Sequence, residues 1–297
     1  MDYQLKVVML ECNIMRLFDK QGKYAERELA AWREHLAEKG IQLIVRAREK
    51  YGLAKEKDDF WDILPPNGEL LITDDESRAR QRRKKHGAVM GLLHSGNQGT
   101  SFEGVKYLGI DPTQMDTEDL ERIYRRCMGI PWRILETKDC YLRETTVEDV
   151  DEFYEIYRDP SVTAYMEDLF EDRDKEIAYT QDYIRNVYEY YGFGVWTVCQ
   201  RGTGRVIGRA GVSYREGFLQ PELGFVIGVP WQGHGLAGQV CEAITRFAKT
   251  KLGFSELIAF ADLENKPSIR LLEKLKFVEQ DPSPIPGSKV HKFFLAL

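Results

Sequence analysis

The sequence is poor in cysteine, and the few cysteines are not arranged to build a structural site. Cys12, Cys127, Cys140, Cys199 and Cys241 are widely scattered and include no C-x-x-C pair. An odd, scattered set argues against both a disulfide framework and a zinc site. We therefore expect reduced cysteines, no bound metal and a cytoplasmic protein.

Long apolar runs and a net positive charge are missing as well. No segment approaches the ~18 apolar residues of a membrane span, and Met1 to Leu10 lacks the basic region and apolar core of a leader peptide. The formal charge of -6 gives the chain no general attraction to nucleic acid or anionic lipid. One basic segment, Arg78 to His86, has no interleaved aromatic residues. It is typical of a solvated helix, with binding to a nucleic acid or an acidic partner as the alternative.

The apolar pattern predicts two α/β domains, residues 1–136 and 137–297. In the first, short apolar runs alternate with helical patterns, which favours a small Rossmann-like domain with a parallel sheet. Its predicted strands are Leu5–Leu10, Ile41–Val45, Glu69–Thr73 and Ala88–Leu93, and its predicted helices are Glu26–Lys39, Asp75–His86 and Glu118–Arg126. The second domain is predicted to be a mixed sheet flanked by helices, with a helix at Lys175–Tyr190 and a hairpin turned at Arg201–Gly204.

A glycine-rich loop carries the clearest chemical signal. Between Pro221 and Val240 a predicted strand runs through Gly233, Gly235 and Gly238 into a helix. Glycines allow close approach of a ligand, and the free N–H groups of a first helical turn favour anions, so the loop predicts a phosphate or pyrophosphate site. The loop also fits the dinucleotide pattern G-x-G-x-x-G. Against that alternative, V-P-W-Q separates the strand from the first glycine, and too few residues follow Asp262 to complete a dinucleotide domain.

Two motifs in the second half resemble those of a known superfamily. Gln232, Gly235 and Ala237 fill a Q-x-x-G-x-A pattern, and Asn265 and Ser268 fill N-x-x-S-x-x-L-x-x-K. With them, the segment from Cys140 resembles the GNAT superfamily of N-acetyltransferases, and D-P-S-V-T-A-Y-M resembles its ribosomal-protein N-terminal-acetyltransferase-like subgroup. The resemblance implies direct transfer of acetyl from acetyl-CoA to a primary amine. A non-catalytic acetyl-CoA-binding sensor or scaffold is the alternative.

The resemblance also implies where acetyl-CoA would bind. The pantetheine arm would follow the strand Phe225, Val226, Ile227, Gly228 and Val229, and the pyrophosphate would sit on the loop Gln232, Gly233, His234, Gly235, Leu236, Ala237 and Gly238. The Asn265 amide would bind the cofactor arm, and Ser268 would lie beside the sulfur end or the phosphate arm. The structural alternative for these two residues is a helix N-cap with a first-turn hydroxyl.

The catalytic residues implied by the resemblance are Glu222 and Ser268. Glu222, at the start of its strand, would take the ammonium proton through water, and an exposed strand glutamate without a catalytic role is the alternative. Relatives often have a tyrosine as proton donor where this chain has Leu272. A thiol with a pKa of about 8.5 leaves tolerably well without a donor, and Ser268 is a possible substitute.

The acceptor is expected to be a small-molecule or peptide amine. It would enter beside an acidic segment that a solvated loop explains equally well: Tyr165, Met166, Glu167, Asp168, Glu171 and Asp172. No membrane or nucleic-acid partner is expected. The oligomeric state stays open, a homodimer included.

The first half resembles a degenerate haloacid dehalogenase-like domain. Strand Leu70–Thr73 leads into D-D-E-S, which is similar to the last acidic turn of that family, and Glu11 and Asn13 occupy the positions of its catalytic aspartates. Without those aspartates we expect no phosphatase activity. The segment His94–Gly99 is expected to be a flexible loop. An alternative makes this half the functional core, as a nucleotide or phosphate binder.

Overall fold

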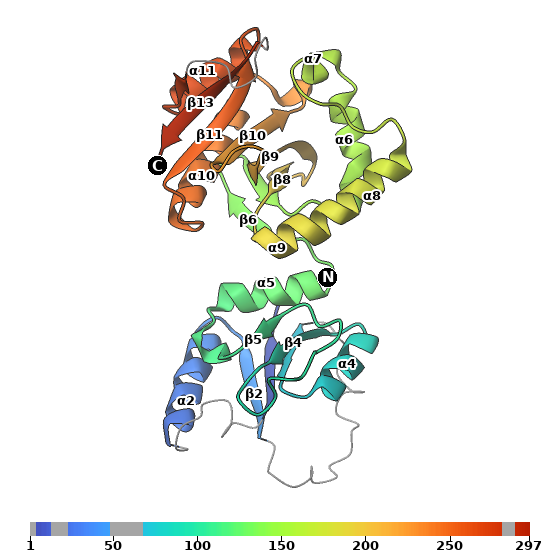
Figure 1. Ribbon diagram of the computed structural model, residues 1–297, viewed down its shortest axis with the longest axis vertical. Coiled ribbons are helices and arrows are strands. Elements are labelled where there is room, and N and C mark those ends of the chain that lie inside the picture. Colours follow the sequence, from blue (N-terminus) through green and yellow to red (C-terminus); the bar gives the residue numbers. More distant parts are fainter. Residues whose placement is uncertain (1–3, 13–22, 48–67, 281–288) are drawn as a thin grey trace. The chain divides into compact units, whose positions relative to one another are not determined.

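The computed structural model describes residues 4–12, 23–47, 68–280 and 289–297 (Figure 1). The chain folds into two compact units, Met1–Trp132 and Arg133–Leu297. Residues Arg133–Glu136, at the end of the predicted first domain, form a strand of the second unit's sheet. Within the described ranges, no helix combines the length and the apolar character needed to cross a membrane.

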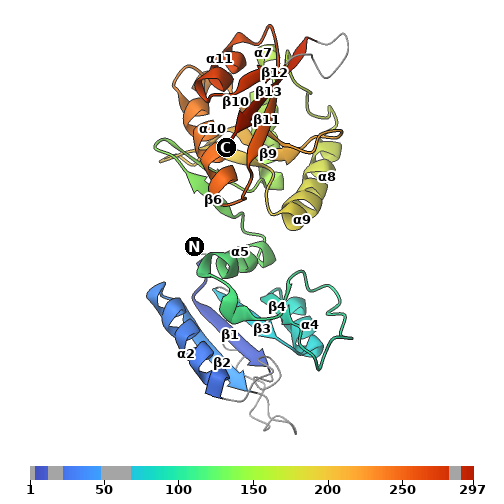
Figure 2. The same ribbon diagram turned by 60° about the vertical axis from the view of Figure 1, so that its left-hand side comes forward.

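The first unit is a five-stranded parallel sheet covered by helices on both faces (Figure 2). Its elements are β1 (Val7–Cys12), α2 (Lys23–Glu38), β2 (Gln42–Ala47), β3 (Glu69–Thr73), α4 (Glu76–Lys84), β4 (Ala88–Leu92), β5 (Leu108–Gly109), η1 (Pro112–Gln114) and α5 (Thr117–Cys127). The strand order is β2-β1-β3-β4-β5, with all neighbours parallel. Because both faces are covered, the strands are apolar without alternation. One face packs with Trp32 of α2 and Tyr124 of α5, and the other with Ala79 of α4.

The second unit is an eight-stranded mixed sheet. Its strands are β6 (Arg133–Glu136), β7 (Cys140–Arg143), β8 (Val195–Gln200), β9 (Val206–Tyr214), β10 (Pro221–Ile227), β11 (Glu256–Asp262), β12 (Val278–Gln280) and β13 (Val290–Ala296), in the order β12-β13-β11-β10-β9-β8-β7-β6. Its helices are η2 (Val147–Asp149), α6 (Val150–Tyr157), α7 (Pro160–Thr163), α8 (Arg173–Tyr183), α9 (Glu189–Tyr191), η4 (Val229–Trp231), α10 (Leu236–Thr250) and α11 (Lys266–Lys274). Among the described strands of this sheet, only β10 and β11 pair in parallel. The predicted α/β class, with a parallel first sheet and a mixed second sheet flanked by helices, is confirmed.

The alternating side chains of the second sheet face two different helical layers. Trp196, Leu223 and Ile227 pack in the cluster that includes Val240 and Ile244 of α10. On the opposite face, Val226 packs against Phe153 and its neighbours from α6. Consecutive strand residues point to opposite faces, so β9 and β10 present every second residue to the layer that contains α6 and α8.

The basic helix of the first unit is more buried than a solvated surface. Arg82 of α4 is 7% exposed and donates to Glu69 at 3.1 Å. Burial raises the pKa of Glu69 and lowers that of Arg82, and the mutual attraction of the pair opposes both shifts. A Cβ at Gly87 would lie 2.2 Å from Arg82 Nε, so glycine there makes room for the guanidinium. The prediction of a solvated helix holds for Arg80, Arg83 and Lys84 but not for Arg82, which pairs with a buried glutamate.

The single helix predicted at Lys175–Tyr190 is interrupted. After α8 comes a π-helical turn, η3 (Ile184–Tyr188), and then α9. The Tyr183 hydroxyl accepts from Val195 N at 2.7 Å, and the Tyr188 hydroxyl donates to the carbonyl of the same residue. The wider π turn places two tyrosines, five residues apart, over one strand residue.

The end of α11 offers a test of backbone strain. Lys276 has φ 72°, in the left-handed region. Its N–H bonds to Glu273 O at 2.9 Å and that of Phe277 bonds to Leu272 O at 2.9 Å, the Schellman pattern for which glycine is favoured. The exposed Lys276 bears a Cβ that costs roughly 1 kcal/mol there.

We expect Lys276→Gly to stabilise the second unit by about 1 kcal/mol and to raise its Tm by roughly 2–4 °C, because glycine relieves this strain. Thermal unfolding would measure the change. Lys274→Gly, inside the helix, is the control and should destabilise by about 1 kcal/mol. A destabilising Lys276→Gly would contradict the strain argument.

Candidate active site

The loop before α10 presents a row of backbone donors. Gly233 and Gly235 both have φ 77°, and Gly235 is the N-cap of α10 without any side-chain cap. On either side of the row, Gln232 N bonds to Val229 O at 3.1 Å and Gln239 N bonds to Gly235 O at 3.1 Å. None of the N–H groups from Gly233 to Gly238 has an acceptor within the described part of the chain. Such a row, at the positive end of a helix dipole, is complementary to phosphate oxygens.

Strands β10 and β11 separate beside this loop. They are in register only at Glu222 and Ile258, whereas β10 pairs with β9 along its full length. The residues of β10 after Glu222 therefore have no strand partner on the β11 side. Their backbone N–H and C=O groups on that side can bond to an extended ligand that enters between the strands.

The predicted cofactor residues of the loop differ in what their side chains do. Gln232 Nε2 donates to Ile227 O at 2.8 Å, so this side chain holds the loop against the end of β10. Leu236 is buried in the core and can offer only its N–H, while His234 is exposed. A Cβ added at Gly238 would have only the Leu271 side chain within 4 Å, at 3.8 Å. The loop would thus contact a ligand mainly through its backbone.

The second motif sits at the start of α11. Asn265 is the N-cap, and its Oδ1 accepts from Ser268 N at 3.2 Å, so its amide nitrogen stays available. The Ser268 hydroxyl makes no hydrogen bond within the described residues. Leu272 is 1% exposed and packs in the core, so the position that holds a tyrosine in many relatives offers no proton donor.

Glu222 is held in a two-pronged ion pair. Arg215 Nε donates to Glu222 Oε2 at 2.6 Å and Nη2 donates to Oε1 at 2.9 Å. The Glu222 side chain is 14% exposed. It lies opposite Ser213 and on the same face of β10 as Gly224. A carboxylate has about four lone-pair sites, so two donors leave room for a water.

A pocket of about 450 Å³ opens on this face of the sheet. Its floor includes Val195, Arg209, Ser213, Gly224 and Val226, and its walls and rim include Tyr157, Met166, Glu167, Tyr179, Tyr183, Val187, Tyr191, Phe193, Tyr214 and Phe225. A Cβ at Gly224 would meet no atom within 4 Å, so this glycine faces open space. The size suits a small-molecule ligand.

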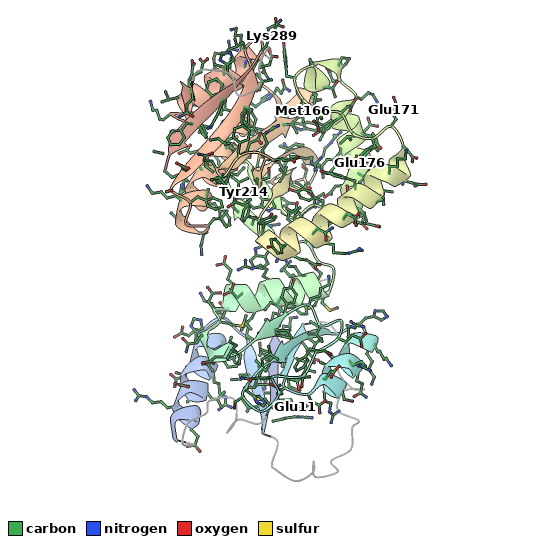
Figure 3. The ribbon with its side chains drawn as sticks, in the orientation of Figure 1. Glu11, Met166, Glu171, Glu176, Tyr214 and Lys289 are labelled. Atoms are coloured by element: carbon green, nitrogen blue, oxygen red, sulfur yellow. The ribbon has the colours of Figure 1, made fainter. Side chains whose placement is uncertain are left out.

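The pocket tests the expected acceptor entrance. Met166 and Glu167 line it, as the acidic-segment hypothesis requires. Asp172 instead caps α8 by accepting from Asp174 N at 3.0 Å, and Asp168 accepts from Leu169 N at 2.8 Å. Glu171 lies on the outside of the unit (Figure 3). Only part of the acidic segment is therefore positioned to meet a ligand.

The sequence interpretation missed Arg209 and the surrounding tyrosines. The available signal was a charged residue within the buried run V-I-G-R-A-G-V of β9. Tyr157 and Tyr183 come from helices more than twenty residues away in the sequence, and no motif links them to β9.

The first unit has a polar cluster at the carboxyl end of its sheet, where Glu11 lies (Figure 3). Glu11 Oε1 is 3.4 Å from Arg78 Nε, and Asp74 Oδ2 is 3.2 Å from His94 Nε2. Asp75 is the N-cap of α4. Asn13 lies outside the described residues. In the described ranges, no three His, Cys, Asp or Glu side chains are grouped to hold a metal ion.

The segment His94–Gly99 is a turn held by side chains. Asn97 Nδ2 donates to Leu92 O at 2.7 Å and to Asp74 O at 3.3 Å, and its Oδ1 accepts from His94 N at 2.7 Å. These bonds tie the turn to the ends of β3 and β4, which the expectation of a flexible loop did not foresee.

Comparisons with known proteins bear on the second unit. Residues 139–278 match the family described as acetyltransferase (GNAT) domain. The uncharacterized N-acetyltransferase p20 of Bacillus licheniformis is 28% identical over 153 residues, covering 49% of this chain and 83% of p20. The uncharacterized N-acetyltransferase YoaA of Bacillus subtilis (strain 168) is 27% identical over 151 residues, covering 50% and 84%. The solved acetyltransferase from Agrobacterium tumefaciens str. C58 is 19% identical with a TM-score of 0.48, covering 55% and 94%. Residues 139–278 of this chain therefore form a GNAT acetyltransferase domain.

Proposed function

We propose that the second unit is an enzyme that transfers the acetyl group of acetyl-CoA directly to a primary amine. The observation that carries the proposal is the row of unpartnered N–H groups from Gly233 to Gly238, next to the point where β10 and β11 separate. The row suits a pyrophosphate, and the gap between strands suits the amide-bearing arm of a coenzyme. The amide nitrogen of Asn265 and the free hydroxyl of Ser268 would contact the same ligand.

In the proposed reaction, acetyl-CoA supplies the acetyl group as a thioester. The amine nitrogen bonds to the acetyl carbon, the carbon–sulfur bond breaks, and the thiol leaves. Glu222, through a water, would accept the proton that the nitrogen loses. A backbone N–H near Ile227 would hold the carbonyl oxygen as negative charge develops on it. Since Leu272 cannot donate a proton, the thiolate would be protonated by solvent or by Ser268.

The resemblance to ribosomal-protein N-terminal acetyltransferases remains part of this proposal and does not name the acceptor. For the first unit, a degenerate haloacid dehalogenase-like domain stays a prediction from the sequence. Glu11 is engaged by Arg78 and Asp75 by the first turn of α4, which supports our expectation of no phosphatase activity. Magnesium-dependent turnover that is lost on changing Asp74 would contradict it.

The cofactor site is tested by replacing a loop glycine. We expect Gly235→Glu to weaken acetyl-CoA binding at least about 100-fold, because it adds a carboxylate beside the N–H row and strains a residue at positive φ. A Cβ at Gly235 meets no atom within 4 Å, so the fold should persist. Calorimetric titration of acetyl-CoA, with NADH in parallel, measures the effect.

Gly202→Glu is the matched control, because Gly202 also has positive φ (83°) and open space, but lies in the β8–β9 turn. It should bind acetyl-CoA as the unmodified protein does. Binding of NADH in place of acetyl-CoA would reopen the dinucleotide alternative. Tight acetyl-CoA binding without thiol release, over a wide amine screen, would favour the sensor or scaffold.

A further inference from the structure

The floor of the pocket holds an arginine without a carboxylate partner. Arg209 makes no ion pair within the described part of the chain, and its Nε is buried without a hydrogen-bond acceptor. Its guanidinium carbon lies 4.7 Å from the centroid of the Phe153 ring, a distance at which a cation–π interaction stabilises the charge. Arg143, on β7 of the same sheet, does have a carboxylate partner, since its Nη1 and Nη2 donate to the two oxygens of Asp149.

The groups around Arg209 are mostly hydrogen-bond donors. The Tyr183 hydroxyl accepts from Val195 N, so its own proton is left to donate. Burial raises the pKa of Tyr157 and the nearby Arg209 opposes the rise, so this hydroxyl also keeps its proton at neutral pH. Glu176 is the buried acid of this region, and its charge favours the charged form of Arg209, but the two side chains form no direct ion pair and Glu176 Oε2 accepts from Phe170 N at 3.2 Å. Burying a cation without a directly paired counter-ion is costly, which favours a ligand that supplies one.

Arg209 lies close to the part of β10 where acetyl transfer is proposed to occur. Arg209 lies directly opposite Val226, where β10 has already lost its contact with β11. Neighbouring strands are about 4.8 Å apart, so an anion on Arg209 lies a short distance from the proposed site of acetyl transfer. The rest of the pocket is largely aromatic, with Phe193 and Tyr214 in edge-to-face contact at 5.8 Å.

We propose that the acceptor is a free amino acid with an apolar or aromatic side chain, whose carboxylate pairs with Arg209. The inference rests on the proposed acetyltransferase function and narrows its substrate class. Guanidinium binds carboxylate through two parallel hydrogen bonds, and Tyr157 and Tyr183 add further donors. The amine, two bonds from the carboxylate carbon, faces β10, and the side chain occupies the aromatic part of the pocket.

The test compares free amino acids with their carboxamides in an assay of thiol release from acetyl-CoA, using the full chain. Phenylalanine, leucine, methionine and tryptophan are each paired with the amide, which keeps the amine and side chain but removes the negative charge. We expect kcat/KM to be about 100-fold higher for the acids, since a charged hydrogen-bonded pair is lost in the amides.

Arg209→Met should lower kcat/KM for the acids about 100-fold, chiefly through KM, and should leave the amides nearly unchanged. Arg158→Met, at the C-cap arginine of α6 with a side chain that is 73% exposed, is the control and should change neither. Acetyl-CoA titration of each variant checks that the cofactor site is intact. Equal turnover of acids and amides, or turnover only with amines that lack a carboxylate, overturns the inference but leaves the acetyltransferase standing. A protein that does not bind acetyl-CoA overturns both.

Discussion

Replacing Asp149 with alanine is expected to destabilise the second unit by about 3–5 kcal/mol, because it leaves a largely buried arginine, Arg143, without its counter-charge. Asp149 is 3% exposed and bonds to Arg143 through both oxygens, at 2.7 Å for Nη1. Its Oδ2 also accepts from Thr146 N and Thr197 Oγ1, each at 2.9 Å. One carboxylate thus connects β7, β8 and the start of α6.

Urea unfolding followed through the second unit's own signal would measure this loss. Asp151→Ala is the matched control, since Asp151 lies two residues on and pairs with Arg173 in full contact with solvent. Surface pairs of this kind contribute little, so the control should unfold with the unmodified protein. Similar urea midpoints for the two variants would mean that the hydrogen bonds of Asp149 contribute less to the free energy of unfolding than their geometry suggests.

Replacing Glu222 with glutamine is expected to lower kcat/KM for acetyl transfer by roughly 10²–10⁴-fold, the usual contribution of a general base. Glutamine nearly matches the shape of glutamate but cannot accept the proton of the acceptor amine. Acetyl-CoA binding should be unchanged, because the predicted cofactor contacts lie further along β10 and in the loop. Steady-state thiol release, together with calorimetry, separates the two effects.

The control for Glu222 is Glu216→Gln, an exposed carboxylate in the β9–β10 connection. It should retain full activity. Turnover by the Glu222 variant within a few-fold of normal would mean that the ion pair with Arg215 is structural and that solvent removes the proton.

Sequence patterns predicted the elements whose local chemistry is unambiguous. Strand Glu69–Thr73 has the predicted limits, because its buried run ends at clear turn and polar residues. The short edge strands β5, with two residues, and β12, with three, were not predicted. Their pairing depends on neighbouring strands and not on an alternating apolar pattern in their own sequence. The π turn was not predicted for a related reason, because an apolar pattern with a period of 3.6 residues does not reveal one extra residue in a single turn.

In the candidate site too, the features set by local sequence were predictable, and those set by tertiary packing were not. The donor row of the loop was predictable because its glycines and its position before a helix are local features. Asn265 as an N-cap was foreseen as an alternative, and its geometry allows a second role. Arg209, Tyr157 and Tyr183 converge only through tertiary packing, so no spacing in the chain could identify the pocket. Arg215, in the β9–β10 connection, was missed because nothing in the local sequence indicated that its partner would be Glu222.

The π turn at Ile184–Tyr188 has a consequence for tolerance to changes in chain length. Surface helices usually absorb the loss of one residue at little cost when the deleted position is exposed. Here a deletion would return the turn to α-helical winding and rotate Tyr188 relative to Tyr183, so that the two hydroxyls could no longer hold both backbone groups of Val195. Val195 and Tyr183 both line the pocket. A single codon lost from this exposed helix would therefore damage the proposed acceptor site while leaving every motif residue in place.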